Sequence, residues 1–163
     1  MEKGLAIITG ADGGMGQVIT AALAKEGYPV IMACLDPEKA ASICTRIQQE
    51  TGNMQIEVRA INLASLSSVN NFTGQLLKEG RPVSRLMNNA GILTTPVRKT
   101  EDGLETIVSV NYMAPYMLTR QLLPLMQPEC RIVNTVSCTY AIGRIEPDFF
   151  EKGKNGRFFR IPV

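Results

Sequence analysis

The sequence predicts an α/β fold, a doubly wound parallel sheet of about five strands. Short apolar runs of strand length alternate with amphipathic segments of helix length through most of the 163 residues. The first apolar run, Leu5 to Ile8, ends at Thr9-Gly10 in a turn crowded with glycines, and a helical segment follows. Because right-handed crossovers make such a sheet parallel, we expect the strand order 3-2-1-4-5 and a ligand at the carboxyl ends of the strands.

Composition limits the class of protein. With 45% hydrophobic and 20% charged residues, the chain has the balance of one soluble globular domain. A net charge of +2 does not favour nucleic acid or a membrane surface as a partner. No apolar run approaches the roughly 20 residues that cross a bilayer. The N-terminus lacks the pattern of a signal peptide, so we expect a cytoplasmic protein.

The chain contains four cysteines and no histidine. The cysteines are scattered without a CxxC pair, which predicts reduced and mostly buried thiols, namely Cys34, Cys44, Cys130 and Cys138. The lack of histidine excludes Ser-His-Asp and Cys-His chemistry and histidine metal sites, and no metal site is predicted. An enzyme with this composition needs tyrosine, lysine or a carboxylate as its proton carrier.

The first half of the chain reads as two strand–helix units. The helix after the glycine turn is expected to reach about Glu26, and a second buried strand covers 29–34. Asp36 has the character of an N-cap, with proline in the first helical position, and the second helix lasts to about Glu50. A glycine follows each helix as its stop.

The second half continues the alternation. We expect strands over 55–61, 85–88 and 131–135, and Ser65 as the cap of the helix between the first two. Residues Thr100-Glu101-Asp102 resemble another helix start, and the helix over 103–123 is apolar enough to pack on two sides. Pro115 should kink it or follow a local break. Beyond the last strand periodicity fades, and 146–163 is largely loop.

The glycine turn has the spacing Gly10-x-x-x-Gly14-x-Gly16 after Thr9. Glycines admit a close ligand, and the helix start offers free N–H groups, so the pattern suits a diphosphate. It is not the G-x-G-x-x-G pattern and lacks the lysine of a P-loop, and a plain tight turn is the alternative. TGxxxGxG resembles the cofactor motif of the short-chain dehydrogenase/reductase family.

Four later stretches resemble the same family in the same order. They are Asn62-Leu63 in place of Asp-Leu, Asn88-Asn89-Ala90-Gly91 as NNAG, Val110-Asn111-Tyr112 around the catalytic asparagine, and Arg131 to Ser137 as RIVNVSS. The resemblance covers Leu5 to about Ile145 and is greatest to the retinol-dehydrogenase-like branch.

The resemblance implies a Rossmann-type NAD(P)-binding domain over residues 1–163 and hydride transfer between a nicotinamide and an alcohol or carbonyl substrate. It implies that Ser137 holds the reacting oxygen and that Asn111 bends its helix and holds a water. The implied cofactor residues are Gly10, Asp12, Gly13, Gly14, Met15, Gly16, Leu35, Asn62, Leu63, Asn89, Ala90 and Gly91.

Each of these polar residues also has a structural interpretation. Ser137 can be an ordinary polar residue at a strand–loop junction, Asn111 can bond a nearby backbone carbonyl, and Asn89 can tie two strands together. The choice between NAD and NADP stays open. Asp36 has the spacing of a ribose-binding acid but reads more readily as an N-cap, and Leu35 and Gly13 replace basic residues of NADP-preferring relatives.

The family's Tyr-x-x-x-Lys motif has no match. Tyr140 and Arg144 mimic it, but Tyr140 lies too near Ser137 and arginine is too wide to replace lysine. We therefore expect a truncated chain with weak or no turnover. A non-catalytic dinucleotide-binding or interaction module and a cofactor-free structural relative are the alternatives. Members of the family are often dimers or tetramers, so a homo-oligomer also stays open.

Overall fold

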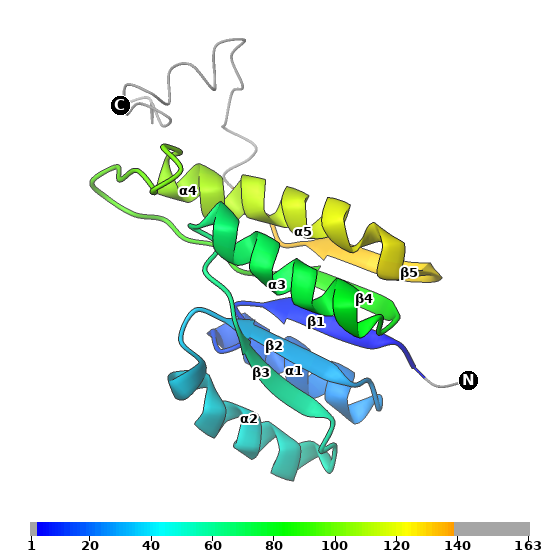
Figure 1. Cartoon of the computed structure of the whole chain (residues 1–163). Coiled ribbons are helices and arrows are strands. Elements are labelled where there is room, and N and C mark those ends of the chain that lie inside the picture. The colour runs from blue at the N-terminus through cyan, green and yellow to red at the C-terminus, as the bar shows by residue number, and fades with distance from the viewer. Residues whose placement is uncertain (1–2, 139–163) are drawn as a thin grey trace.

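The computed structural model describes residues 3–138, which form one five-stranded parallel sheet in the order β3-β2-β1-β4-β5 (Figure 1). The predicted fold class and strand order are confirmed. The strands are β1 (Leu5–Thr9), β2 (Val30–Cys34), β3 (Ile56–Ala60), β4 (Val83–Asn88) and β5 (Met126–Asn134). The helices are α1 (Gly14–Lys25), α2 (Pro37–Thr51), α3 (Leu66–Glu79), α4 (Thr106–Val108), a π-helical turn over Ser109–Met113, α5 (Ala114–Leu122) and a 3-10 turn over Leu123–Leu125.

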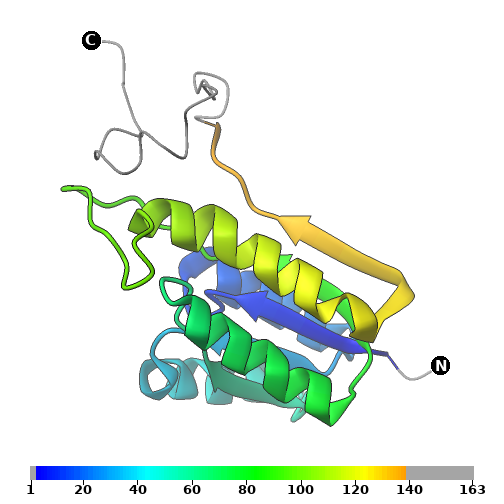
Figure 2. The same ribbon diagram turned by 45° about the horizontal axis from the view of Figure 1, so that its top comes forward.

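Two hydrophobic cores sandwich the sheet. Ala6 and Ile8 of β1 face the core that α1 and α2 complete, whereas Leu5 and Ile7 face the core of α3 and α5. Figure 2 shows α3 and α5 side by side over one face, with β5 at the edge of the sheet. All residues of β1 and β2 are buried, because helices cover both faces of these central strands.

Local capping signals place the helix starts correctly for α2 and α3. The Asp36 carboxylate accepts a hydrogen bond from the Lys39 N–H at 3.2 Å, and the Ser65 hydroxyl accepts one from the Ser68 N–H at 3.3 Å. Both caps satisfy N–H groups that have no partner inside the helix.

The expected helix start at Thr100-Glu101-Asp102 is wrong. These residues form a turn in which Gly103 has a φ of 76°, and the helix begins only at Thr106. The two acidic residues act on the start of α3 instead: Ser65 Oγ donates to Glu101 Oε1 at 2.5 Å, and the Leu66 N–H donates to Asp102 Oδ2 at 2.9 Å. Carboxylates stabilise any nearby helix N-terminus, including one distant in sequence.

Pro115 follows a local break, as one of the two predicted outcomes. The π-helical turn over Ser109–Met113 directly precedes α5, and the proline stands in the first turn of α5, where its missing N–H costs little. Packing on two sides is not seen in the described part of the chain. Leu118 and Leu122 are buried, but Tyr116 on the other side is 55% exposed.

Strand β5 differs most from its predicted bounds. It starts at Met126, five residues before the expected Arg131, and its register against β4 shifts between Val83 and Arg85. Of the four free thiols, Cys34 and Cys44 are buried as expected, whereas Cys130 is half-buried and Cys138 is exposed. The expected loop at 146–163 and the Tyr140–Arg144 segment lie outside the described residues.

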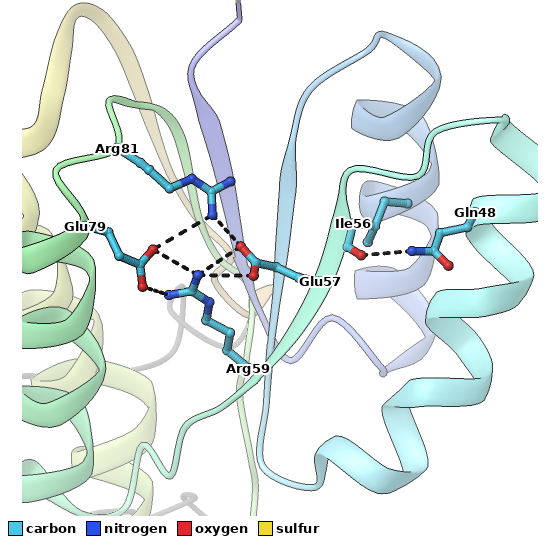
Figure 3. A network of polar contacts seen from close by, with 6 residues as sticks. All are labelled: Gln48, Ile56, Glu57, Arg59, Glu79 and Arg81. Atoms are coloured by element: carbon cyan, nitrogen blue, oxygen red, sulfur yellow. Dashed lines mark hydrogen bonds and ion pairs between the residues drawn. The ribbon is translucent and has the colours of Figure 1, made fainter.

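A four-residue ion-pair network ties β3 to the end of α3 (Figure 3). Arg59 contacts Glu79 at 2.6 Å and Glu57 at 3.0 Å, and Arg81 also contacts Glu57. Arg59 is the least exposed member, and its hydrogen bonds to Glu79 hold the pKa of that carboxyl below its ordinary value. The network joins the edge strand β3 to the C-terminal end of α3.

Candidate functional site

A pocket of about 460 Å³ opens at the carboxyl ends of the central strands. Each of the twelve residues that the sequence assigns to a cofactor lines it, from the glycine turn, the end of β2 and the segments after β3 and β4. Parallel strands end at one edge, so segments that are distant in sequence meet there. Six further lining residues were not predicted: Ala33, Ile61, Ala64, Ile92, Thr106 and Val110. Apolar residues at strand ends could have signalled the first four, whereas Thr106 and Val110 depend on the misplaced helix start.

The glycine turn is held tightly. Gly10 has a φ of 61°, and its carbonyl accepts a hydrogen bond from the Gly13 N–H at 3.1 Å. A Cβ on Gly16 would lie only 2.1 Å from the Gly10 oxygen, so α1 can begin this close only with glycine there. A Cβ on Gly14, by contrast, would meet nothing within 4 Å.

The start of α1 fits a diphosphate. No side chain caps it and no acidic residue lies in its first turn, which leaves its first N–H groups available to an anion. Gly14 lines the pocket and has open space where a Cβ would stand, so a ligand can approach the backbone there. The start of α1 therefore has the open N–H groups that the glycine spacing predicts, and binding of a diphosphate there stays a prediction.

Thr9 and Asn89 lock the glycine turn to the end of β4. The Thr9 hydroxyl accepts hydrogen bonds from the N–H groups of Asn89 and Ala90, both at 3.0 Å. The Asn89 amide donates to the carbonyls of Thr9 at 3.0 Å and Gly10 at 3.3 Å, so its structural interpretation is confirmed. Its Oδ1 is buried and has no protein partner among the described residues, which leaves one acceptor beside the pocket for a ligand hydroxyl. The sequence signalled Thr9 only as the residue before Gly10.

Asn111 lies in the π-helical turn and bonds the backbone of Ile92 in both directions. Its Oδ1 accepts from the Ile92 N–H and its Nδ2 donates to the Ile92 carbonyl, each at 2.9 Å. The alternative of a backbone contact is therefore what the structure shows. Ser109, on the same turn, donates to the carbonyl of Leu63 at 3.0 Å. These contacts connect the π-helical turn to Ile92 after β4 and to Leu63 after β3, both of which line the pocket. Nothing in the sequence indicated the Ser109 contact.

Ser137 is not among the residues that line this pocket. It follows β5 at the same carboxyl edge of the sheet, where the Thr135 N–H donates to the Asn88 carbonyl at 3.0 Å. Its side chain is exposed and does not line the pocket. The structure therefore brings the twelve cofactor residues together around one pocket, and Ser137 is not among the residues that line it.

Asp36 is an N-cap and not a pocket residue. Its carboxylate pairs with Lys39 at 3.0 Å, and hydrogen bonding to Lys39 lowers its pKa. Asp12 is the charged residue among those lining the pocket. Burial, and secondarily the charge of Asp12, raise the pKa of the Cys34 thiol to about 12, so this cysteine is a neutral packing residue.

A second cavity of about 570 Å³ lies at the opposite, amino edge of the sheet, beside the ion-pair network. Lys3, Glu57 and Arg81 contribute its charges, and none of the predicted site residues lines it. Within residues 3–138, no helix has the length and apolar character to cross a membrane. In the same range no group of three or more potential metal ligands is found.

Comparisons with known proteins agree with this geometry. Retinol dehydrogenase 11 of Homo sapiens is 37% identical over 141 residues, which cover 85% of this chain and 44% of the relative. Retinol dehydrogenase 13 of Homo sapiens is 36% identical over 144 residues, with 87% and 44% covered. The chain thus spans less than half the length of these curated relatives.

Solved structures show the same architecture. An uncharacterized protein from Mycobacterium paratuberculosis superposes with a TM-score of 0.81 at 33% identity, over 98% of this chain and 54% of that one. A metagenomic short-chain oxidoreductase, solved with NADP, has a TM-score of 0.65 at 26% identity, over 76% and 57% of the two chains. The family model described as short chain dehydrogenase matches residues 4–146. With that match over most of its length, and with relatives of the retinol-dehydrogenase branch, the chain belongs to the short-chain dehydrogenase family.

Proposed function

We propose that this chain binds NAD or NADP in the pocket at the carboxyl edge and forms the cofactor-binding part of an oxidoreductase. One observation carries the proposal: an open, uncapped helix start and twelve independently predicted residues surround a single pocket. The bound nicotinamide would supply or accept the hydride of an alcohol or carbonyl substrate. The relative solved with NADP supports the same cofactor class.

The residues of the pocket suit the parts of a dinucleotide. The first N–H groups of α1 bind the diphosphate, and the free Oδ1 of Asn89 accepts from a ribose hydroxyl. Ala90 and Gly91 leave room beside it, while Asn62 and Leu63 contact the adenine. These assignments extend the sequence predictions and are part of the proposal.

Catalysis needs further groups. We propose that Ser137 donates a hydrogen bond to the reacting oxygen and that Asn111 orders a water near it. The 163-residue sequence contains no Tyr-x-x-x-Lys, so we expect weak or no turnover from this polypeptide alone. A cytoplasmic location and a homo-oligomeric state stay predictions.

A second candidate is a dinucleotide-binding module without chemistry. Two observations favour it: Ser137 is not among the residues that line the pocket, and the Asn111 amide makes one donated and one accepted hydrogen bond to the backbone of Ile92. The two candidates share the cofactor and differ in whether a hydride moves.

Calorimetric titration of the purified chain with NADH and NADPH tests the shared proposal. We expect saturable heat with at least one of them, and the absence of heat with both would overturn it. Following the absorbance of the reduced nicotinamide with a panel of ketones and aldehydes then separates the candidates. If the chain is catalytic, Ser137→Ala lowers the turnover rate and leaves the Kd of the cofactor unchanged. If no variant and no substrate gives turnover, the binding module is the better description.

A further inference from the structure

The charge of the pocket bears on which of the two cofactors it accepts. NADP carries a phosphate on the adenosine ribose where NAD has a hydroxyl group, and that phosphate adds a charge of about −1.5 to −2 at neutral pH. Apart from Asp12, the pocket is lined by glycine and by apolar, threonine and asparagine residues. No lysine or arginine among residues 3–138 lines it. The pocket therefore offers a carboxylate and no cation to this part of the ligand.

The position of Asp12 makes this charge relevant. In this class of fold the adenosine ribose lies near the end of the second strand, after the diphosphate turn. Cys34 is the last residue of β2, and the charge of Asp12 helps to raise the pKa of its thiol. Leu35, the next residue, lines the same pocket and is 71% exposed. Asp12 thus stands at the ribose end of the pocket.

The other charged groups near this end already have partners. Asp36 caps α2 and pairs with Lys39 at 3.0 Å. Arg46 contacts Glu50 at 3.0 Å and Gln17 at 2.7 Å. Lys39 and Arg46 are the cations in these pairs. Neither would offset the negative charge of Asp12 without giving up a contact that the structure shows.

We propose that Asp12 is the specificity-determining residue of the pocket: its carboxylate accepts a hydrogen bond from the ribose 2′-hydroxyl and repels a 2′-phosphate. The chain then prefers NAD(H) to NADP(H). This inference rests on the proposed function. It assigns to Asp12 the ribose-binding role that the sequence spacing alone would give to Asp36. Like charges held within a few ångströms at a partly solvated site are expected to separate the two affinities by roughly tenfold to a hundredfold.

The test is calorimetric and needs no turnover. The Kd values of NADH and NADPH are measured for the wild-type chain, for Asp12→Asn and for the matched control Asp36→Asn. Wild type should bind NADH at least roughly tenfold more tightly, and the difference should shrink at high salt as the repulsion is screened. Asp12→Asn should bring the two Kd values close together, mainly through tighter NADPH binding. Asp36→Asn removes a carboxylate that does not line the pocket, keeps a good N-cap and should leave the ratio unchanged.

The outcomes are distinct. Equal binding of both cofactors by wild type, a preference for NADPH, or an Asp12→Asn ratio that matches wild type overturns the inference and leaves the proposed function standing. Failure of both cofactors to bind overturns both. Thermal unfolding of each variant shows whether it folds. If Asp12→Asn does not fold, Asp12→Ser provides the same comparison, and the wild-type preference is already a test.

Discussion

Gly14 and Gly16 give the sharpest test of the glycine turn and the start of α1 as a diphosphate site. Alanine at Gly16 should lower stability, whereas alanine at Gly14 should weaken cofactor binding. A Cβ on Gly16 would lie 2.1 Å from the Gly10 oxygen and 2.7 Å from the Ala11 Cα, both backbone atoms that cannot rotate away. The turn or the start of α1 must shift. Overpacking of this kind costs about 1–3 kcal/mol in the free energy of unfolding. For a domain of this size, each kcal/mol lowers Tm by about 2–4 °C, so Gly16→Ala should lower it by roughly 2–12 °C.

Gly14→Ala is the matched variant. Its Cβ would meet nothing within 4 Å, and alanine favours a helix over glycine by up to about 1 kcal/mol, so its Tm should stay constant or rise. The methyl group would stand in the space where the ligand approaches. Losing one charge-assisted hydrogen bond to a phosphate costs about 1.5–3 kcal/mol, which weakens the Kd by roughly 10- to 150-fold.

Differential scanning fluorimetry and calorimetric titration measure the two effects separately. The expected pattern is a stable but weakly binding Gly14→Ala chain and a destabilised Gly16→Ala chain. A wild-type Tm for Gly16→Ala would show that the turn does not have this conformation in solution. Wild-type affinity for Gly14→Ala would show that the diphosphate does not lie at the start of α1.

Three further substitutions test two residues that hold the pocket segments together and the ion-pair network between β3 and α3. Thr9→Val removes the hydroxyl that accepts two backbone N–H groups after β4, which should cost about 1–3 kcal/mol in denaturant unfolding, and Thr9→Ser should restore it. If both variants unfold alike, the hydroxyl is not the acceptor. Asn111→Ala removes both contacts to Ile92, so the Ile92 amide should exchange with solvent faster, and unchanged exchange would refute the contact. Arg59→Met removes the ion pairs with Glu57 and Glu79 and should lower the free energy of unfolding by about 1 kcal/mol at neutral pH. Because the pKa of Glu79 is lowered in the fold, its contribution is complete above its ordinary value of 4.5 and is lost as the pH falls through the lower folded value. The variant and wild type should therefore converge in stability in acid, and a constant difference across the pH range would contradict this account.

Much of the pocket could be predicted because its signals are local. The glycine turn, the NNAG segment and Asn62-Leu63 each follow a strand, and a parallel sheet sends all these strand ends to one edge. The helix start before Thr106 could not be placed in this way, because Glu101 and Asp102 have the composition of a cap and nothing in the sequence says which helix they cap. The two missed wall residues Thr106 and Val110 follow from the same error.

The sequence by itself determined the alternation of strands and helices, the caps at Asp36 and Ser65 and the glycine cradle, since each depends on residues within a few positions of one another. Only the tertiary structure decided that Asn111 bonds Ile92, that the charge of Asp12 acts on Cys34 at the end of β2, and that Ser137 is not among the residues that line the pocket. These outcomes depend on how distant segments pack across the sheet. A side chain's partner there is set by the crossing of elements and not by its own neighbours in the chain.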